Sequence, residues 1–491
     1  MTHRLIAIFI TLMCIGVLTG CASVPKEAGF PDIQNIIEQR IGSRVHWNQG
    51  TSEDAAVVDA VRSMLQQELT IDEAVQIALL NNRSLQATYE DLGVAQADLV
   101  QAGLLRNPLF GASFRFPDKT VGGHRSTNTE FSVVQDFLDL LVRPLRKKVV
   151  AAQFEQTKLR VGNSILNLAA EVRSAYYALQ ADEQTIEMRR TVVQATEAAV
   201  DIATRQHDAG TLKTLDLSNQ QGFYDQAKLD MTRTDILIVA DRERLNRLMG
   251  IWGADTMWKL HKRLPELPES EIPMEHLESI AVSQRLDLAA ARQETQVIAH
   301  ALSLTRKYRY FYVFDVGVDS EHDVADNVNL SGPNVTIELP IFDQRQAAIA
   351  RLESQLRQSQ HRLSSLAIDI RSEVREVRNR LLAARNVVKY YHDVVLPIRQ
   401  RIVDESQLYY NGMLIGVYEL LLAKQNQINA GREYIEALQD YWIARSDLER
   451  AVGGRLIAVA ESTKQPSQRG AQPDDKPSEP SEHKHHKEFD N

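Results

Sequence analysis

Few residues in this chain have side chains whose type and spacing could do chemistry. The 491 residues include only two cysteines, Cys14 and Cys21, and three histidines, His483, His485 and His486, lie together near the C-terminus. Imidazole nitrogens bind Cu²⁺ and Zn²⁺, so these histidines are a candidate metal site, with a solvated, disordered tail as the alternative. The sequence contains no phosphate-binding loop, dinucleotide-binding glycine motif, zinc-protease motif or paired-cysteine motif. We therefore expect a protein that is not an enzyme and that holds no cofactor.

Cys21 ends an N-terminal targeting segment. Arg4 precedes an apolar run over residues 5–18, which is too short to span a bilayer and is typical of a signal peptide. Residues 18–21, Leu-Thr-Gly-Cys, resemble the lipobox of bacterial lipoproteins. The resemblance implies cleavage before Cys21 and a lipid on its thiol, which would anchor the chain without spanning the membrane. A chance cysteine beside an ordinary cleavage site is the alternative.

The composition excludes several classes of protein. The chain has 65 acidic and 56 basic residues and a net charge of −9, which gives no support for a nucleic-acid partner. Its 23 glycines and 15 prolines are few for an all-β or low-complexity protein of this length. After residue 20, no run of 18 or more apolar residues occurs, which argues against an ordinary multi-span helical membrane protein.

The chain contains the same module twice. Glu-Val-Arg at residues 171–173 recurs at 373–375, and several other segments recur in the same order at an offset of about 203 residues. Such a long period indicates a duplicated domain rather than a solenoid repeat. The predicted division is a signal peptide (1–20), a lipid-anchored N-terminal segment (21–66), a first repeat (67–261), a proline-containing linker (262–274), a second repeat (275–458) and a disordered His-containing tail (459–491).

Each half is predicted to contain a helix, a β-hairpin, a long helix, a turn and a further helix. Period-two alternation predicts strands over about 109–117, 127–138, 311–319 and 330–341. The same alternation places Phe114, Phe131, Val316 and Ile337 on the apolar faces of their strands, and Ser113 and Thr336 on the polar faces.

The long helices carry seven-residue hydrophobic spacing, which predicts coiled-coil packing. The first stretch, from Pro144 to His207, would be roughly 95 Å long at 1.5 Å per residue. Gly210 and Gly412 follow the two long helices and are the expected left-handed caps at the helical-tip turns.

Four strands cannot line a pore alone, because hydrocarbon does not tolerate open sheet edges. Two chains would form an eight-stranded barrel, whose interior is filled by side chains. Three chains would form a twelve-stranded barrel, which could contain a channel. A half-buried soluble sheet is the alternative.

The duplicated plan, the Leu-Pro-Ile-Phe-Asp string at 339–343 and the glycine-containing tips at 209–217 and 411–420 together resemble the TolC-like outer membrane efflux proteins. The resemblance implies a mainly α fold with a small β part, assembled as a homotrimer with a twelve-stranded β-barrel continued by an α-helical coiled-coil barrel. It also implies insertion into outer-membrane lipid and docking to a periplasmic adaptor protein and an inner-membrane pump. Lipid-anchored members serve heavy-metal or drug efflux.

The resemblance also implies a gate at the helical tips. Asp216 matches the acidic position of the first repeat, whereas Tyr418 and Leu421 stand where the family has aspartates in the second repeat, and the neighbouring Glu419 is the candidate replacement. The other interpretation of Asp216 is a solvated first-turn residue that the helix dipole favours. The expected function is a passive export duct, for metal ions rather than drugs; the alternatives are a drug duct and a non-conducting, envelope-spanning coiled-coil scaffold.

Overall fold

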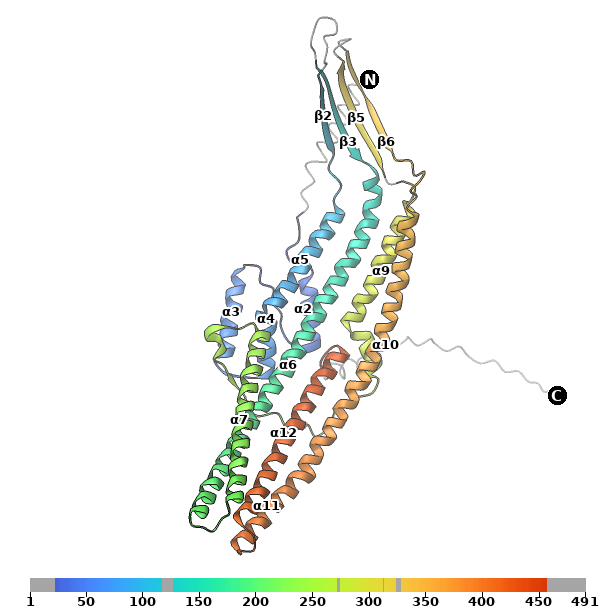
Figure 1. The fold of residues 1–491 in the computed structure, drawn as a ribbon. Helices are drawn as coiled ribbons and strands as arrows, with labels where there is room; N and C mark the ends of the chain where they lie inside the picture. The colour runs from blue at the N-terminus through green and yellow to red at the C-terminus, as the bar shows by residue number, and fades with distance from the viewer. Residues whose placement is uncertain (1–22, 117–126, 272–273, 312, 324–327, 457–491) are drawn as a thin grey trace, which may run out of the picture.

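The computed structural model describes residues 23–116, 127–271, 274–311, 313–323 and 328–456 of the chain. These residues form an elongated rod, with a four-stranded sheet at one end and two helical hairpins at the other (Figure 1). Helices α2 (Phe30–Ile41), α3 (Ser52–Leu65) and α4 (Ile71–Asn81) lie beside the middle of the rod. Within the described residues, no helix is both long enough and apolar enough to cross a membrane.

The two halves of the chain repeat one order of elements, and the fold is mainly helical with a small sheet, as the sequence predicts. The first half continues from α4 with α5 (Arg83–Gly103), β2 (Leu109–Arg115), β3 (Asn128–Asp136), α6 (Leu138–Asp208) and α7 (Thr214–Met249). The second half contains α8 (Leu277–Gln284), α9 (Leu286–Lys307), β5 (Phe314–Asp323), β6 (Val328–Ile337), α10 (Gln346–Tyr390), the π-helical turn η2 (Tyr391–Val395), α11 (Leu396–Asn411) and α12 (Val417–Val452). Between the halves lie the short 3-10 helix η1 (Gly253–Thr256) and β4 (Lys259–Leu260), which pairs in parallel with β1 (Glu68–Leu69).

The long helix of the first half is longer than the sequence predicts. Helix α6 has 71 residues and encloses Pro144 instead of beginning there, so it is about 105 Å long at 1.5 Å per residue. Its first turn forms ahead of the proline because the Asp136 carboxylate accepts a hydrogen bond from the Asp139 backbone N–H over 3.1 Å. The proline removes one backbone hydrogen bond and does not end the helix.

The equivalent helix of the second half is interrupted. Helix α10 passes through the π-helical turn η2 into α11, which carries Pro397 in its first turn. Proline has no backbone N–H, so regular i→i−4 bonding fails at this point and the helix widens before it resumes.

The four strands form one antiparallel sheet in the order β2-β3-β5-β6. Strands β3 and β5 pair from Thr129 opposite His322 to Asp136 opposite Asp315, so the sheet joins the hairpins of the two halves. Several strand boundaries differ from the expected ones. Strand β3 ends at Asp136 because α6 begins two residues later, and β6 ends at Ile337 ahead of Pro340, which cannot donate to a strand ladder. Strand β5 is displaced toward the chain's C-terminus and begins at Phe314, where pairing with Ile337 starts.

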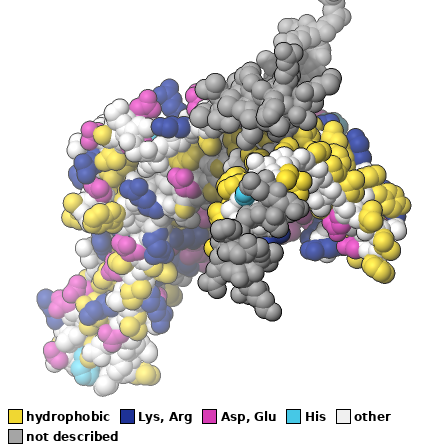
Figure 2. All heavy atoms as spheres, turned by 90° about the horizontal axis from the view of Figure 1, so that it is seen from above, with side chains coloured by type: hydrophobic (Ala, Val, Ile, Leu, Met, Phe, Trp, Pro, Cys, Tyr) yellow, Lys and Arg dark blue, Asp and Glu magenta, His cyan; other side chains and the backbone are white. Residues whose placement is uncertain are grey.

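The register places all four predicted apolar residues on one face of the sheet. Phe131 lies opposite Ala112 and Ser320, and Phe314 lies opposite Ile337. Phe114, Phe131 and Ile337 are 55%, 45% and 47% exposed, which leaves the apolar face uncovered in a single chain. Hydrophobic side chains gather over the strands when the rod is viewed from the sheet end (Figure 2).

The opposite face of the sheet is polar. Ser113 lies opposite Glu130, and Thr336 lies opposite Asp315. Arg115 on β2 forms ion pairs with Glu130 on β3 at 2.7 Å and with Glu321 on β5 at 3.6 Å. This sheet therefore has one face suited to hydrocarbon and one suited to water.

The hydrophobic core lies in the middle of the rod, where α4, α5, α6, α8, α9, α10 and α12 meet. Its largest fully buried side chains are Tyr89, Tyr441, Ile33, Ile37, Leu69, Ile77, Leu79, Leu92, Ile165, Leu179 and Leu245. Helix α2 contributes Ile33 and Ile37 and packs against α6. The segment that precedes the first repeat is thus part of the folded core.

Candidate functional site

The two helical tips lie at the end of the rod opposite the sheet (Figure 1). One tip joins α6 to α7, and the other joins α11 to α12. Several hydrogen bonds hold the first turn. Among them, the Gly210 backbone N–H donates to the His207 carbonyl over 2.8 Å, and the His207 ring nitrogen Nδ1 lies 2.9 Å from the Leu212 carbonyl. The second turn is held by the Leu414 backbone N–H, which donates to the Tyr409 carbonyl over 2.8 Å.

The glycine prediction is right for one tip and wrong for the other. Gly210 has a φ of 74°, in the left-handed region, whereas Gly412 has a φ of −79°. The Gly412 backbone N–H still donates to the Leu408 carbonyl, so the helical pattern runs one residue further. The left-handed residue is Met413, with a φ of 56° and a side chain that is 93% exposed. Met413 follows Gly210 by 203 residues, which is the offset of the repeat.

Asp216 and Glu419 occupy equivalent places at the two tips. Asp216 lies three residues after Lys213, the N-cap of α7, and Glu419 lies three residues after Gly416, the N-cap of α12. Both side chains are exposed. A carboxylate in the first turn of a helix is stabilised by the helix dipole, so local helix energetics accounts for part of their placement.

Tyr418 connects the two tips. Its hydroxyl donates a hydrogen bond to the side-chain oxygen Oε1 of Gln206, on the last turn of α6, over 3.0 Å. Burial raises the pKa of the Tyr418 phenol, and the negative charge of Asp216 raises it further. Tyr418 therefore lies close to Asp216 and bonds the second repeat to the first.

A hollow of about 230 Å³ lies beside this contact, between α6, α7 and α12. Its lining includes Val192 and Ala199 from α6, Phe223 from α7, and Glu419 and Leu422 from α12. Phe223 and Leu422 are about half exposed. The hollow is mainly apolar with one carboxylate at its edge, which suits the side chains of a protein segment better than a small ion.

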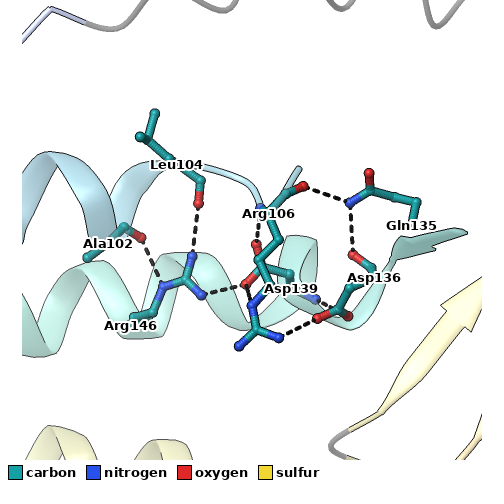
Figure 3. Close-up of polar contacts among 7 residues, drawn as sticks. All are labelled: Ala102, Leu104, Arg106, Gln135, Asp136, Asp139 and Arg146. Carbon is teal, nitrogen blue, oxygen red and sulfur yellow. Dashed lines mark hydrogen bonds and ion pairs between the residues drawn. The ribbon is translucent and has the colours of Figure 1, made fainter. Parts of the chain in front are cut away.

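A second polar site lies at the junction of helices and sheet (Figure 3). The Arg146 guanidinium on α6 donates to the carbonyls of Ala102 and Leu104 at the end of α5, over 3.1 and 2.9 Å, and to the Asp139 carboxylate. The Arg106 backbone N–H also donates to Asp139, over 3.0 Å. These bonds fix the chain that leaves α5 toward β2 against the start of α6.

Asp139 is the centre of this junction and is only 4% exposed. Burial alone would raise the pKa of its carboxyl, but the hydrogen bonds and positive charges of Arg146 and Arg106 outweigh it, and the pKa lies below the ordinary value. Sequence reasoning did not single out this site. The signal was present, because the segment that ends in Asp139 recurs 204 residues later and ends in Asp343.

Two acidic side chains face each other between α6 and α7. Burial, followed by the charge of the nearby Asp241 carboxylate, raises the pKa of Asp182 to about 7. Glu183 and Glu436 contribute further negative charge. Asp182 therefore takes up or releases a proton near neutral pH.

The other sequence-predicted site residues lie outside the described part of the chain. Cys21 precedes residue 23, where the described residues begin, and His483, His485 and His486 follow residue 456, where they end. Among the described residues, no group of three or more His, Cys, Asp or Glu side chains could hold a metal ion.

Comparison with known proteins gives one consistent result. Residues 74–251 match the family model described as Outer membrane efflux protein. The cobalt-zinc-cadmium resistance protein CzcC of Cupriavidus metallidurans is 20% identical over 392 residues, which cover 78% of this chain and 90% of that protein. The probable efflux pump outer membrane protein TtgC of Pseudomonas putida is 23% identical over 270 residues, which cover 51% of this chain and 53% of that protein.

Solved structures show the same fold. A membrane protein from Pseudomonas aeruginosa superposes with a TM-score of 0.68 at 17% identity, and the match covers 78% of this chain and 92% of that one. The structure of CusC superposes with a TM-score of 0.65 at 15% identity, with the same coverage of each chain.

Proposed function

The chain belongs to the outer membrane efflux protein family, and we propose from this premise that it is the passive outer-membrane duct of a tripartite efflux system. The observation that carries the proposal is the sheet register, which gives one apolar and one polar face, and the continuation of the same sheet into helices of about 100 Å. A sheet of this kind suits a bilayer, and helices of this length suit the passage across the periplasm. The protein is an outer-membrane protein that extends into the periplasm.

The duct is a homotrimer. Within one chain the order β2-β3-β5-β6 leaves β2 and β6 without a second neighbour among the described strands. A membrane excludes open strand edges, and three chains close them as a twelve-stranded barrel wide enough for a lumen. The apolar faces of the sheets then contact lipid, and the polar faces line the channel.

The helical tips form the periplasmic entrance of this duct. A three-fold axis converts Asp216 and Glu419 into rings of three carboxylates each, and such rings favour cations. The hydrogen bond from Tyr418 to Gln206 holds the two tips of one chain together, which supports a closed resting entrance.

A periplasmic adaptor protein docks at the same end of the rod, and the inner-membrane pump supplies the energy. The hollow between α6, α7 and α12, with the half-exposed Phe223 and Leu422, supports this assignment because it is apolar and open to the outside. The chain itself contributes a lumen, a constriction and a docking surface, and it performs no enzymatic step.

Cys21 carries the lipid that anchors the mature N-terminus, after removal of residues 1–20. The apolar sheet faces hold far more apolar area than acyl chains do, so insertion into the membrane does not depend on the lipid. The Cys21→Ser variant is expected to lose incorporation of labelled palmitate and to keep its oligomer. Palmitate in that variant would contradict the assignment.

The exported substrate is a metal ion rather than a drug. CzcC, whose name refers to cobalt, zinc and cadmium, aligns over 90% of its length, whereas TtgC aligns over about half. The chain also carries His483, His485 and His486 near its C-terminus, and these side chains could raise the local metal concentration without tight binding. Selectivity then belongs mainly to the pump.

Deletion of the gene in its native host tests the substrate. We expect sensitivity to cobalt, zinc, cadmium or copper with little change in tolerance to dyes and antibiotics, and only a small effect when residues 480–491 alone are removed. Unchanged metal tolerance with sensitivity to dyes or antibiotics would establish the drug duct instead. A chain that assembles in the membrane and never conducts would be the coiled-coil scaffold.

A further inference from the structure

A polar contact between the two halves of the chain involves residues that recur elsewhere in the repeat. The recurring residues do not contact each other within a single chain. Helix α6 of the first half packs against α9 of the second half. There the Glu294 carboxylate on α9 accepts a hydrogen bond from the Gln156 side chain over 3.2 Å and lies 3.4 Å from the Arg160 guanidinium, both on α6. We call these three residues the α6–α9 clasp.

Burial fixes the register between α6 and its counterpart α10. Val172 and Leu179 on α6 are buried, and so are Val374 and Leu381 on α10, at an offset of 202 residues. Both helices are continuous from this region to the residues of the clasp. The counterparts of Gln156 and Arg160 are therefore Gln358 and Arg362, which are the same residue types.

The register between α5 and α9 is fixed in the same way. Each helix follows an N-cap residue, Asn82 or Arg285, at an offset of 203 residues. Leu85 and Leu288, three residues after these caps, are both buried. The counterpart of Glu294 is then Asp91, again an acidic residue. All three parts of the clasp thus recur, divided between α10 and α5.

The recurring residues cannot meet within one chain. The helices adjoin in the order α5, α6, α9, α10, so α5 and α10 lie at opposite edges of the array, as β2 and β6 do in the sheet (Figure 1). Asp91, Gln358 and Arg362 are exposed, and none of them has a hydrogen bond or an ion pair to another described residue.

The surface around Asp91 is also uncovered. Val94, one turn further along the same face of α5, is 62% exposed, whereas its counterpart on α9, Val297, is half-buried. Within one chain, α10 packs against α9, whereas no helix of the described residues covers the equivalent side of α5. The difference in exposure is expected if α10 of another copy covers α5.

We propose that Gln358 and Arg362 on α10 of one copy bind Asp91 on α5 of the next copy, as a second clasp between chains. This inference rests on the proposed trimer and specifies which edges and which residues join its chains. In a closed ring, three intrachain clasps then alternate with three interchain clasps at one height of the helical barrel. Because Arg362 and Asp91 have opposite charges, they favour contact between the α10 edge of one copy and the α5 edge of the next. They disfavour contact between two α10 edges or two α5 edges.

Thiol cross-linking in the membrane tests the pairing. The two native cysteines, Cys14 and Cys21, both precede the described rod. In the double variant Asp91→Cys/Arg362→Cys, the only thiols in the described rod are therefore the two introduced ones. With a short bis-maleimide we expect covalent dimers and trimers, and no larger product because the ring closes. The matched control, Arg160→Cys/Glu294→Cys, places the two thiols at the positions of the α6–α9 clasp. In this control we expect the cross-link to form within one chain.

Charge reversal gives an independent readout. Arg362→Glu or Asp91→Arg alone should lower the fraction of detergent-extracted trimer several-fold, and the combination should restore most of it. Cross-linking of the control pair without the 91–362 pair, in a protein that is a trimer and conducts, would overturn the interchain clasp and leave the proposed function intact. A native protein that remains monomeric in the membrane would overturn both.

Discussion

The Tyr418 hydroxyl on α12 and the Gln206 side chain on α6 join the two helical tips through one hydrogen bond of 3.0 Å. Tyr418→Phe keeps the ring and removes this bond, which is worth about 1 kcal/mol. We expect the tips to separate more often, so that the open probability of reconstituted channels rises roughly fivefold. Single-channel recording measures this. The matched control is Tyr224→Phe, which removes a hydrogen bond of 3.4 Å to Glu197 within the first repeat and none between the tips. An unchanged open probability of Tyr418→Phe would show that its bond does not restrain the entrance.

The carboxylates at the tips are expected to set ion selectivity. Asp216→Asn/Glu419→Gln removes six negative charges from the entrance of a trimer, so its preference for cations should fall. The reversal potential across a salt gradient reports the change. Glu53→Gln/Asp59→Asn, which removes the same charge from the exposed surface of α3, should leave the potential unchanged. If the tip variant also leaves it unchanged, Asp216 and Glu419 do not line the constriction.

The two faces of the sheet are expected to respond oppositely to charge. Phe114→Arg or Ile337→Arg places a guanidinium on the lipid face and should destabilise insertion, with a cost that increases with depth to roughly 2–4 kcal/mol at mid-bilayer. Ser113→Arg and Thr336→Arg change the neighbouring residues of the same strands, point to the polar face and should be tolerated. The yield of heat-sensitive oligomer from outer membranes compares them. Equal damage on both faces would indicate a soluble sheet.

The carboxyl pair of Asp182 and Asp241 is expected to make the rod less stable as the pH rises. The pKa of Asp182 is raised to about 7, above the ordinary value of 3.8, so the folded state binds more protons than the unfolded state between these values. Stability should therefore fall from about pH 4 to pH 7 through this group. Asp182→Asn should raise the melting temperature at pH 7–8 and flatten its dependence on pH across this window. A slope equal to that of the native protein would exclude the pair as its source.

The sequence predicts the architecture well because the fold is periodic and repeated. Alternation in the strands places Phe114 and Phe131 on one face, and the register confirms it. The strand ends are less predictable, since β5 is set by its pairing with β6 and not by its own alternation. At the tip turn of the second repeat, glycine at 412 is a strong local signal for the left-handed conformation, but Met413 is the residue that adopts it.

The polar contacts between distant segments were not predictable from spacing. Asp139 and Arg146 are one heptad apart, but their partners at Ala102 and Leu104 come from another helix. Tyr418 could be identified as a departure from the family, yet its partner Gln206 lies 212 residues away. Such contacts depend on how helices cross in space, which no local pattern in a single sequence contains.

Single-channel conductance of the purified, detergent-extracted protein in planar bilayers tests the central proposal most directly. A trimeric duct is expected to insert, to show discrete steps of conductance, and to prefer cations because of the carboxylates at its tips. Heating the sample until the oligomer dissociates should abolish the steps. A native oligomer that enters the bilayer and never conducts, with or without the Tyr418→Phe change, would contradict the export duct and identify the protein as a scaffold.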